Sequence, residues 1–201
     1  MRTQLCGVAA ILVGAVALAQ PAPVVPARYG VAASVAAYPQ GSPKEALASA
    51  IKALDRSSFD TLAAHLLDPK LVDDRVTERA KTLEDGVEKE LRLFRDEQLR
   101  QGVPGRERLP SDAAEFATVV KNEARLRAFK LVVRDAKAHF AESPETVKEF
   151  RRYLREGVVI EAGDVATITL KDVKDAQLNL RRVDLRWHLE DRKGPEPLEK
   201  K

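Results

Sequence analysis

The chain has 201 residues, with 34 Lys and Arg against 31 Asp and Glu, and its formal net charge at pH 7 is +3. Charges of both signs are interspersed and no basic block is flanked by aromatic residues, so the composition excludes nucleic acid as an expected partner. The length fits one folded domain with extended ends.

Residues 1–19 have the pattern of a cleavable secretory signal peptide. The chain begins with a short positive region, Met1-Arg2, continues with an apolar stretch and reaches the small-residue cleavage motif Ala17-Leu18-Ala19. The apolar stretch is about 13 residues long, shorter than the roughly 20 that span a bilayer. We therefore expect cleavage near Ala19/Gln20, export to the periplasm or the extracellular space, and no membrane span after cleavage.

The single cysteine, Cys6, lies within this leader and ahead of its apolar stretch. A lipoprotein-type acylation site would follow the apolar stretch, so we expect no lipid anchor. After cleavage no cysteine is left to form a disulfide. The stability of the mature chain must therefore come from the burial of apolar side chains.

Residues 20–41 are rich in Pro, Ala, Val and Gly and follow neither a helical nor a strand period, so we expect a disordered linker there. Order is expected from Ser42, because SPKE combines an N-cap serine, a proline at the first helical position and a glutamate at the third. Apolar residues at helical spacing then predict a short helix up to Leu54 and a second one that carries His65 and ends at Asp68.

Two long helices are predicted in the middle of the chain. From Leu71 to about Arg100 the apolar positions recur every three or four residues, at Val76, Ala80, Leu83, Val87, Leu91 and Phe94. After a break rich in glycine and proline at residues 102–111, the next helix places Val119, Leu126, Val133 and Phe140 seven residues apart. Two long helices joined by a loop of this kind form an antiparallel pair. A further helix opens at Ser143-Pro144 and closes at Gly157.

After Gly157 the period changes from helix to strand. Residues 158–160 and 165–170 flank a turn, and alternating apolar residues then mark two more strands, the last with Leu185, Trp187 and Leu189. Helices first and antiparallel strands last predict an α+β fold with the helices packed on a C-terminal curved antiparallel sheet of about four strands. One domain is expected over residues 42–191, and a disordered tail over residues 192–201.

Two stretches resemble the nuclear transport factor 2-like superfamily, also called SnoaL-like. The first, SPKEALASAIKALDRSSFDTLAAHLLDP (residues 42–69), is similar to the family's opening of a capped helix, a small-residue break and a second short helix. The second, GDVATITLKD with LNLRRVDLRWHLED (residues 163–191), is similar to its late strands with their tryptophan-bearing hairpin. The resemblance implies a sheet wrapped by helices into a cone with a pocket.

The sequence departs from that family in two places. The turn before the tryptophan usually has Asp-Gly, whereas here it is Asp184-Leu185. Because leucine resists the positive φ of a tight hairpin turn, we expect a longer turn or a bulge. The long helical region from Leu71 to Glu156 exceeds the helix content of a minimal cone, and it could cover or fill the pocket.

Asp184, Arg186 and His188 alternate along the last strand and are the pocket candidates that the sequence offers. A solvent-exposed strand face explains them equally well, and we predict that face and no catalytic group. His65, between apolar neighbours, is predicted to be a partly buried or surface residue. No metal-ligand spacing, nucleophile motif or nucleotide-binding motif is present, so we predict no catalytic, metal-binding or cofactor-binding residue and no cofactor.

These features favour an exported, non-catalytic binding module of the bacterial cell envelope, whose partner is a small molecule or an envelope protein. One alternative is a protein that assembles through the apolar stripe of its long helices. Another is a cone-fold enzyme, an isomerase, dehydratase or hydrolase, acting on a small apolar substrate. A buried acid–base pair in a pocket would indicate the enzyme, and a second apolar stripe left exposed would indicate assembly.

Sequencing the N-terminus of the protein exported by a bacterial host tests the predicted leader. We expect the mature chain to begin at Gln20 or within a few residues of it, because the cleavage motif ends the apolar stretch. Ala19→Arg, which removes the small residue at the cleavage site, should abolish processing. Wild-type protein that keeps Met1 in a membrane fraction would contradict the prediction.

Overall fold

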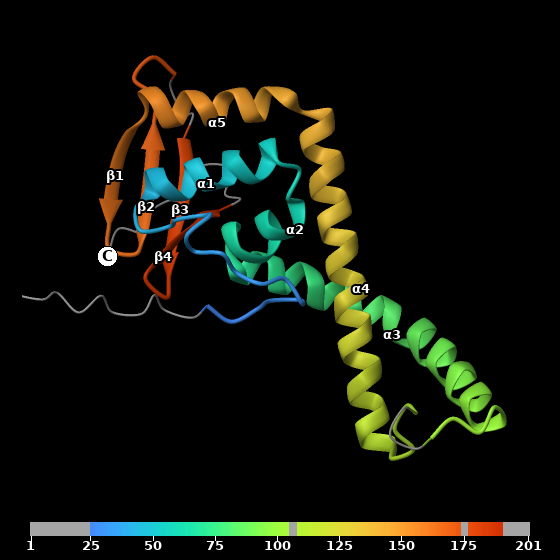
Figure 1. The fold of residues 1–201 in the computed structure, drawn as a ribbon. Helices are drawn as coiled ribbons and strands as arrows, with labels where there is room; N and C mark the ends of the chain where they lie inside the picture. The colour runs from blue at the N-terminus through green and yellow to red at the C-terminus, as the bar shows by residue number, and fades with distance from the viewer. Residues whose placement is uncertain (1–24, 105–107, 174–176, 191–201) are drawn as a thin grey trace, which may run out of the picture.

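The computed structural model describes residues 25–104, 108–173 and 177–190 (Figure 1). The predicted leader at residues 1–19 and the predicted tail at residues 192–201 lie outside these ranges. The described part confirms an α+β fold, with helices first and an antiparallel sheet last. The helices are α1 (Pro43–Asp55), α2 (Phe59–Thr61), the π-helix η1 (Leu62–Leu66), α3 (Pro69–Arg100), α4 (Ala113–Glu142) and α5 (Pro144–Glu156). The strands are β1 (Val158–Ala162), β2 (Val165–Thr169), β3 (Gln177–Val183) and β4 (Arg186–Glu190).

Local side-chain hydrogen bonds fix the starts of three helices. Ser42 Oγ accepts from the Glu45 amide at 3.3 Å, which confirms the predicted start of α1. Asp68 caps α3 by accepting from the Lys70 amide at 3.0 Å, and Asp112 caps α4 in the same way. Each cap satisfies an amide that the first turn of a helix leaves without a backbone partner.

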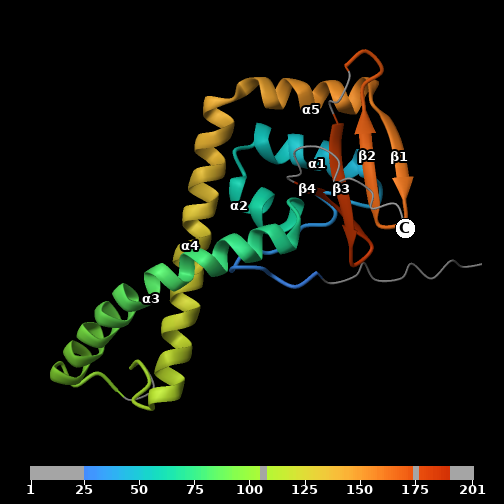
Figure 2. The ribbon, with the colours of Figure 1, turned by 180° about the vertical axis from the view of Figure 1, so that it is seen from behind.

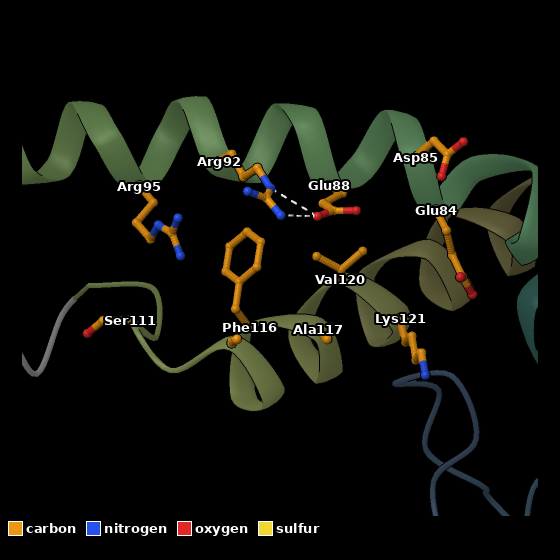
Figure 3. Close-up of a pocket in the computed structure, with 11 residues that line it drawn as sticks. Glu84, Asp85, Glu88, Arg92, Arg95, Ser111, Phe116, Ala117, Val120 and Lys121 are labelled. Atoms are coloured by element: carbon orange, nitrogen blue, oxygen red, sulfur yellow. Dashed lines mark hydrogen bonds and ion pairs between the residues drawn. The ribbon is translucent and has the colours of Figure 1, made fainter.

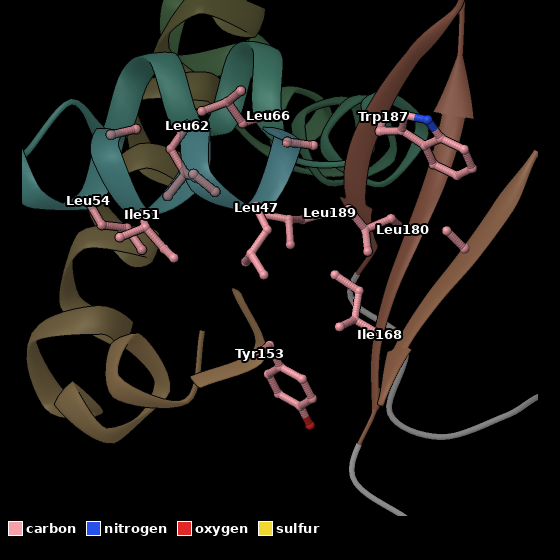
Figure 4. Packing of buried hydrophobic residues seen from close by; sticks show 14 of the residues in the cluster. Leu47, Ile51, Leu54, Leu62, Leu66, Tyr153, Ile168, Leu180, Trp187 and Leu189 are labelled. Carbon is pink, nitrogen blue, oxygen red and sulfur yellow. The ribbon is translucent and has the colours of Figure 1, made fainter. Parts of the chain in front are cut away.

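The four strands form an open antiparallel sheet in the order β1-β2-β3-β4, so the sheet does not close into a cone. Its inner face packs against α1 and η1 (Figure 4). The largest fully buried side chains of this core include Leu47, Leu62, Ile168, Leu180 and Trp187. These side chains fill the space between the helices and the sheet, where the resemblance implies a pocket.

α5 and β1 meet at Gly157, the predicted end of the helix. A Cβ at this position would lie 2.3 Å from the Tyr153 carbonyl oxygen and 2.4 Å from Ile168 Cγ2. Glycine is therefore required for the chain to turn from α5 into the sheet at such close range.

The long helices α3 and α4 pack together in antiparallel sense, since Arg79 pairs with Asp135 and Glu90 with Arg127. The predicted row on α3 is buried at Val76, Ala80 and Val87. On α4 the predicted sevenfold row is wrong at Leu126, which is 39% exposed. The buried residues, most of them spaced by four, are Phe116, Val120, Ala124, Ala128, Phe129 and Val132. Rows spaced by four pack at a large crossing angle, about −50°, rather than as a coiled coil.

The crossing leaves part of the helix pair away from the sheet. We call residues 84–100 of α3 and 111–121, the start of α4 with its cap, the helical arm. In both views the two helices of this arm diverge toward their connecting loop (Figures 1 and 2). Three large apolar side chains of the arm are exposed to solvent, Leu93 at 72%, Phe94 at 55% and Leu99 at 53%. Phe94 extends the apolar row of α3 past the point where α4 covers it.

Residues 25–41, part of the expected linker, differ from that expectation because they make specific contacts with the domain. Arg28 donates to the Ala64 carbonyl at 2.6 Å and pairs with Asp73 at 2.6 Å. The Tyr29 ring stacks on Phe129, with ring centroids 4.5 Å apart, and its hydroxyl also bonds to Asp73. We call residues 25–41 the N-terminal segment; it connects η1, α3 and α4.

β3 and β4 are joined by a two-residue turn, not by the longer turn or bulge that we expected. Val183 pairs with Arg186, and the φ angles of Asp184 and Leu185 are +49° and +63°. This left-handed backbone conformation matches the twist of a two-residue hairpin. For a residue that has a Cβ, adopting it costs about 1–2 kcal/mol of conformational free energy. Leu185 is 84% exposed, so it does not share the buried face of Trp187 and no packing offsets the strain.

Leu185→Gly should raise the free energy of unfolding by about 0.5–1 kcal/mol. Glycine removes the strain of about 1–2 kcal/mol, and the greater freedom of the unfolded chain cancels part of that gain. Urea denaturation of both proteins measures the difference. Leu185→Ala is the matched control, because it removes the exposed side chain but keeps the Cβ. An equal rise in the free energy of unfolding of Leu185→Ala would contradict the explanation by backbone strain.

Candidate functional site

The structure separates the three polar residues of the last hairpin that the sequence offers as pocket candidates. Asp184 is exposed in the turn and Arg186 is half-buried at the start of β4. His188 is only 1% exposed. The predicted solvent-exposed strand face is therefore wrong for His188.

His188 is buried because other segments lie along the outer edge of β4. The Gln40 carbonyl accepts from the Trp187 amide at 3.0 Å, and the Asp68 amide donates to the Leu189 carbonyl at 2.8 Å. Leu67 also forms a parallel bridge with Leu189. The N-terminal segment and the start of α3 thus cover the strand edge on which His188 sits.

The Gln40 side chain joins His188 to a second buried histidine, His65. Gln40 Nε2 donates to the backbone carbonyls of His65 at 2.9 Å and Trp187 at 2.8 Å, and it lies 3.4 Å from His188 Nδ1. His65 Nε2 is 2.9 Å from the Val31 carbonyl oxygen, also in the N-terminal segment. His65 lies on the π-helix η1 and is only 4% exposed, so the predicted partly buried or surface position is wrong.

Burial keeps both histidines neutral in the folded protein at pH 7. It lowers the pKa of His188 from 6.5 to about 4, and the positive charge of Arg186 adds to the effect while Asp68 opposes it. Burial also lowers the pKa of His65, against the hydrogen bond to Val31. The pKa of Arg186 is lowered by burial as well, against the attraction of Asp184.

This histidine cluster has little room for a substrate. The cavity that His65, Gln40 and Arg186 help to line has a volume of about 10 Å³, enough for one water molecule. A general base must reach the proton that it abstracts, directly or through one water. Within the described ranges, no group of three or more His, Cys, Asp or Glu side chains is placed to hold a metal ion. The geometry suits a structural junction.

A larger groove, of about 330 Å³, lies between α3 and α4 in the helical arm (Figure 3). Phe116, Ala117 and Val120 of α4 form its apolar floor, where Ala117 is exposed and Phe116 and Val120 are largely buried, and the Phe116 ring points toward α3. Charged side chains surround that surface. The full lining is Glu84, Asp85, Glu88, Arg92, Arg95, Ser111, Ala113, Phe116, Ala117, Val120 and Lys121.

Charge along the α3 wall of the groove changes sign with position. The three acidic residues, Glu84, Asp85 and Glu88, come first in the chain, and Arg92 and Arg95 follow. Arg92 Nε donates to Glu88 Oε1 at 2.9 Å. The Arg95 guanidinium lies 4.5 Å from the Phe116 ring centroid, a cation–π distance. The α3 wall is therefore acidic at one end and basic at the other, and Lys121 of α4 faces the acidic end (Figure 3).

Sequence reasoning missed this groove and its central residue, Phe116. The available signal was the spacing of Phe116, Val120, Ala124 and Ala128 by four, which we passed over in favour of a sevenfold row. Even with that row, the groove depends on how far the two helices diverge, which their periodicity does not specify.

The chain matches no family model, no curated protein and no solved structure. The similarity to the nuclear transport factor 2-like superfamily therefore rests on the residues quoted for it alone. Among the described helices, none is long and apolar enough to cross a membrane.

Acidification should destabilise the protein as the pH falls from about 6.5 toward 4. Over this interval the unfolded chain binds a proton at His188 that the folded chain does not bind, so the free energy of unfolding decreases with decreasing pH. His188 contributes up to about 1.4 kcal/mol per pH unit. Urea denaturation at several pH values measures the slope.

His188→Gln should make this slope shallower, because glutamine does not titrate. His139→Gln is the matched control for the loss of one histidine, since His139 is exposed on α4. Equal slopes for the wild type and His188→Gln would show that burial does not keep His188 neutral.

Proposed function

We propose that the protein is an exported, non-catalytic binding module that holds a protein partner in the groove of the helical arm. The observation that carries the proposal is the groove itself, in which the exposed Ala117 and the edges of the largely buried Phe116 and Val120 lie between charged walls, in a part of the molecule that projects from the sheet. Export is supported by the leader pattern of residues 1–19.

A segment of a protein fits this groove better than a small metabolite. Pockets that enclose drug-sized ligands have about 300–1,000 Å³, so the groove lies near the lower limit. The exposed Phe94 and Leu99 lie farther along the same arm and enlarge the apolar surface that a macromolecule would contact. An amphipathic helix that docks in a groove uses a similar combination of apolar anchors and flanking charges.

The sign change along α3 defines the partner sequence that we expect. Basic residues of the partner would face Glu84 and Asp85, and acidic residues would face Arg92 and Arg95. Between them, an apolar side chain would contact the exposed Ala117 and the edge of the Phe116 ring. Such charge pairs at the rim contribute chiefly to orientation and rate of association.

A non-catalytic role is supported by the state of the buried histidines. Burial lowers the pKa of His65 and of His188, and the cavity that His65 lines has room for one water only. The groove itself has carboxylates and guanidinium groups on its solvent-facing walls, without a buried acid–base pair of the kind that tunes a pKa for catalysis.

Selection of random peptides displayed on phage against the immobilised protein tests the proposed groove. We expect enriched peptides with an apolar residue between basic and acidic residues. Ala117→Arg, which places a long charged side chain in the groove at an exposed position, should weaken their binding about tenfold or more, which corresponds to about 1.4 kcal/mol.

Ala114→Arg is the matched control, because Ala114 is also exposed on α4 but does not line the groove. Its affinity for the enriched peptides should equal that of the wild type. Peptides that bind Ala117→Arg as tightly as the wild type would place the binding surface elsewhere, and a selection without enrichment would contradict a peptide-binding role.

A further inference from the structure

β1 is an edge strand with an open outer side. It pairs with β2, from Val158 opposite Thr169 to Ala162 opposite Val165, and no other described segment hydrogen-bonds to its backbone. At the opposite edge of the sheet, Gln40 and Asp68 bond to the backbone of β4. Among the residues that the structure describes, the sheet therefore has one protected edge and one edge whose outward amide and carbonyl groups are available to another strand.

The side chains of β1 also lack the features that usually protect an edge. The strand has the sequence VVIEA, with neither proline nor lysine. Val158 and Ile160 lie on the outer face of the sheet and are 43% and 59% exposed, and Val165 of β2 continues this apolar surface at 37%. The single charge, Glu161, lies on the other face, since it is opposite Ala166. Natural edge strands generally place charge or proline where β1 has valine and isoleucine.

We propose that β1 pairs with β1 of a second copy of this chain, antiparallel and centred on Ile160, to form a continuous eight-stranded sheet. A two-fold axis at Ile160 places Ile160 opposite its own copy and Val158 opposite Ala162 of the partner. The whole strand is then paired, and the exposed apolar row continues from one copy into the other. An interface of this kind needs only one self-complementary surface.

The position of Glu161 selects this register among the neighbouring ones. A two-fold axis at Glu161 would place two carboxylates directly opposite each other, which is destabilising. With an axis midway between Ile160 and Glu161, Ile160 of one copy would lie opposite Glu161 of the other. Directly opposed residues share a face, so this register would join the outer face of one sheet to the inner face of the other. An axis at Val159 would place Ala162 opposite Glu156, the last residue of α5, and shorten the paired strand. The axis at Ile160 avoids all three problems and places Glu161 opposite Val159.

A second copy fits this edge better than an unrelated peptide because both sides of the pairing are already present in the chain. The outer-face row of Val158, Ile160 and Ala162 contains no charge that a partner would have to neutralise. A foreign strand would have to supply its own apolar row in register, whereas two-fold symmetry supplies it from the same residues.

Sedimentation equilibrium of the exported protein tests the proposal. We expect the mass of two copies for the wild type and the mass of one copy for Ile160→Lys at the same concentration, because lysine on an edge strand opposes pairing. The matched control is Val165→Lys, on the same face but in the interior strand β2, which should remain dimeric. Circular dichroism and thermal unfolding verify that each variant is folded.

Cross-linking tests the register in a second measurement. In a Cys6→Ser background, Ile160→Cys should form a disulfide-linked dimer on mild oxidation, because directly opposed residues of an antiparallel pair have Cα atoms about 4.5–5.5 Å apart. Glu161→Cys should cross-link at least about tenfold more slowly, since Glu161 faces Val159 of the partner. Cysteine exchange at Ile160 keeps the residue apolar, so this measurement holds even where lysine impairs folding.

Four results would overturn the proposal. A monomeric wild type at the highest soluble concentration would exclude the dimer, and a dimer that persists in folded Ile160→Lys would place the interface elsewhere. Dissociation by Val165→Lys to the same extent as by Ile160→Lys would indicate face-to-face docking. Equal cross-linking rates at positions 160 and 161 would exclude the register. All four are independent of peptide binding in the groove of the helical arm.

Discussion

The amide of Gln40 holds together parts of the chain that are far apart in sequence. Its Nε2 donates to a carbonyl of η1 and to a carbonyl of β4, and its backbone carbonyl accepts from the Trp187 amide. Gln40 is buried, so the loss of these hydrogen bonds would leave polar groups without water. Gln40 thus contributes to the closed edge of the sheet together with Asp68, and to the position of the N-terminal segment together with Arg28 and Tyr29.

The closed edge at β4 in turn determines what the histidines can do. Because the N-terminal segment lies over them, His65 and His188 occupy a region from which bulk water is largely excluded, and the neutral imidazole is favoured. Protonation of a histidine buried in this way lowers the free energy of unfolding, so the effect of pH is on stability. The same histidine on an open strand face would be available for chemistry, so the covering segment decides between the two roles.

Much of the fold could be predicted because its signals are local. Ser42, Asp68 and Gly157 mark element boundaries through contacts with residues a few positions away, and the alternation of Trp187 and Leu189 marks a buried strand face. Contacts between distant residues carry no such signal. Tyr29 is ordered by Phe129, a partner that neither composition nor period reveals. Leu185 adopts a positive φ because strands β3 and β4 constrain the turn, against its own preference.

The helix pair shows the same limit at the candidate site. Both the sevenfold row through Val119 and the fourfold row through Val120 are present in the sequence of α4, and only packing selects the second. Small side chains in that row, Ala124 and Ala128, allow close approach where the helices cross. The oblique crossing then separates the helices farther along, and that separation creates the groove beside Phe116.

The two surfaces proposed for binding lie at opposite ends of the molecule. In both views β1 is at the far side of the sheet from the helical arm (Figures 1 and 2). Pairing of two copies through β1 would therefore leave both grooves unobstructed and directed away from the two-fold axis. A dimer of this form would engage two partner sites at once, and its avidity would exceed the affinity of one groove wherever the partner sites are spaced to match. Charges at the groove rim contribute little affinity individually. Bivalency would supply tight binding from two weak grooves, which gives the open edge at β1 a functional reason to stay unprotected.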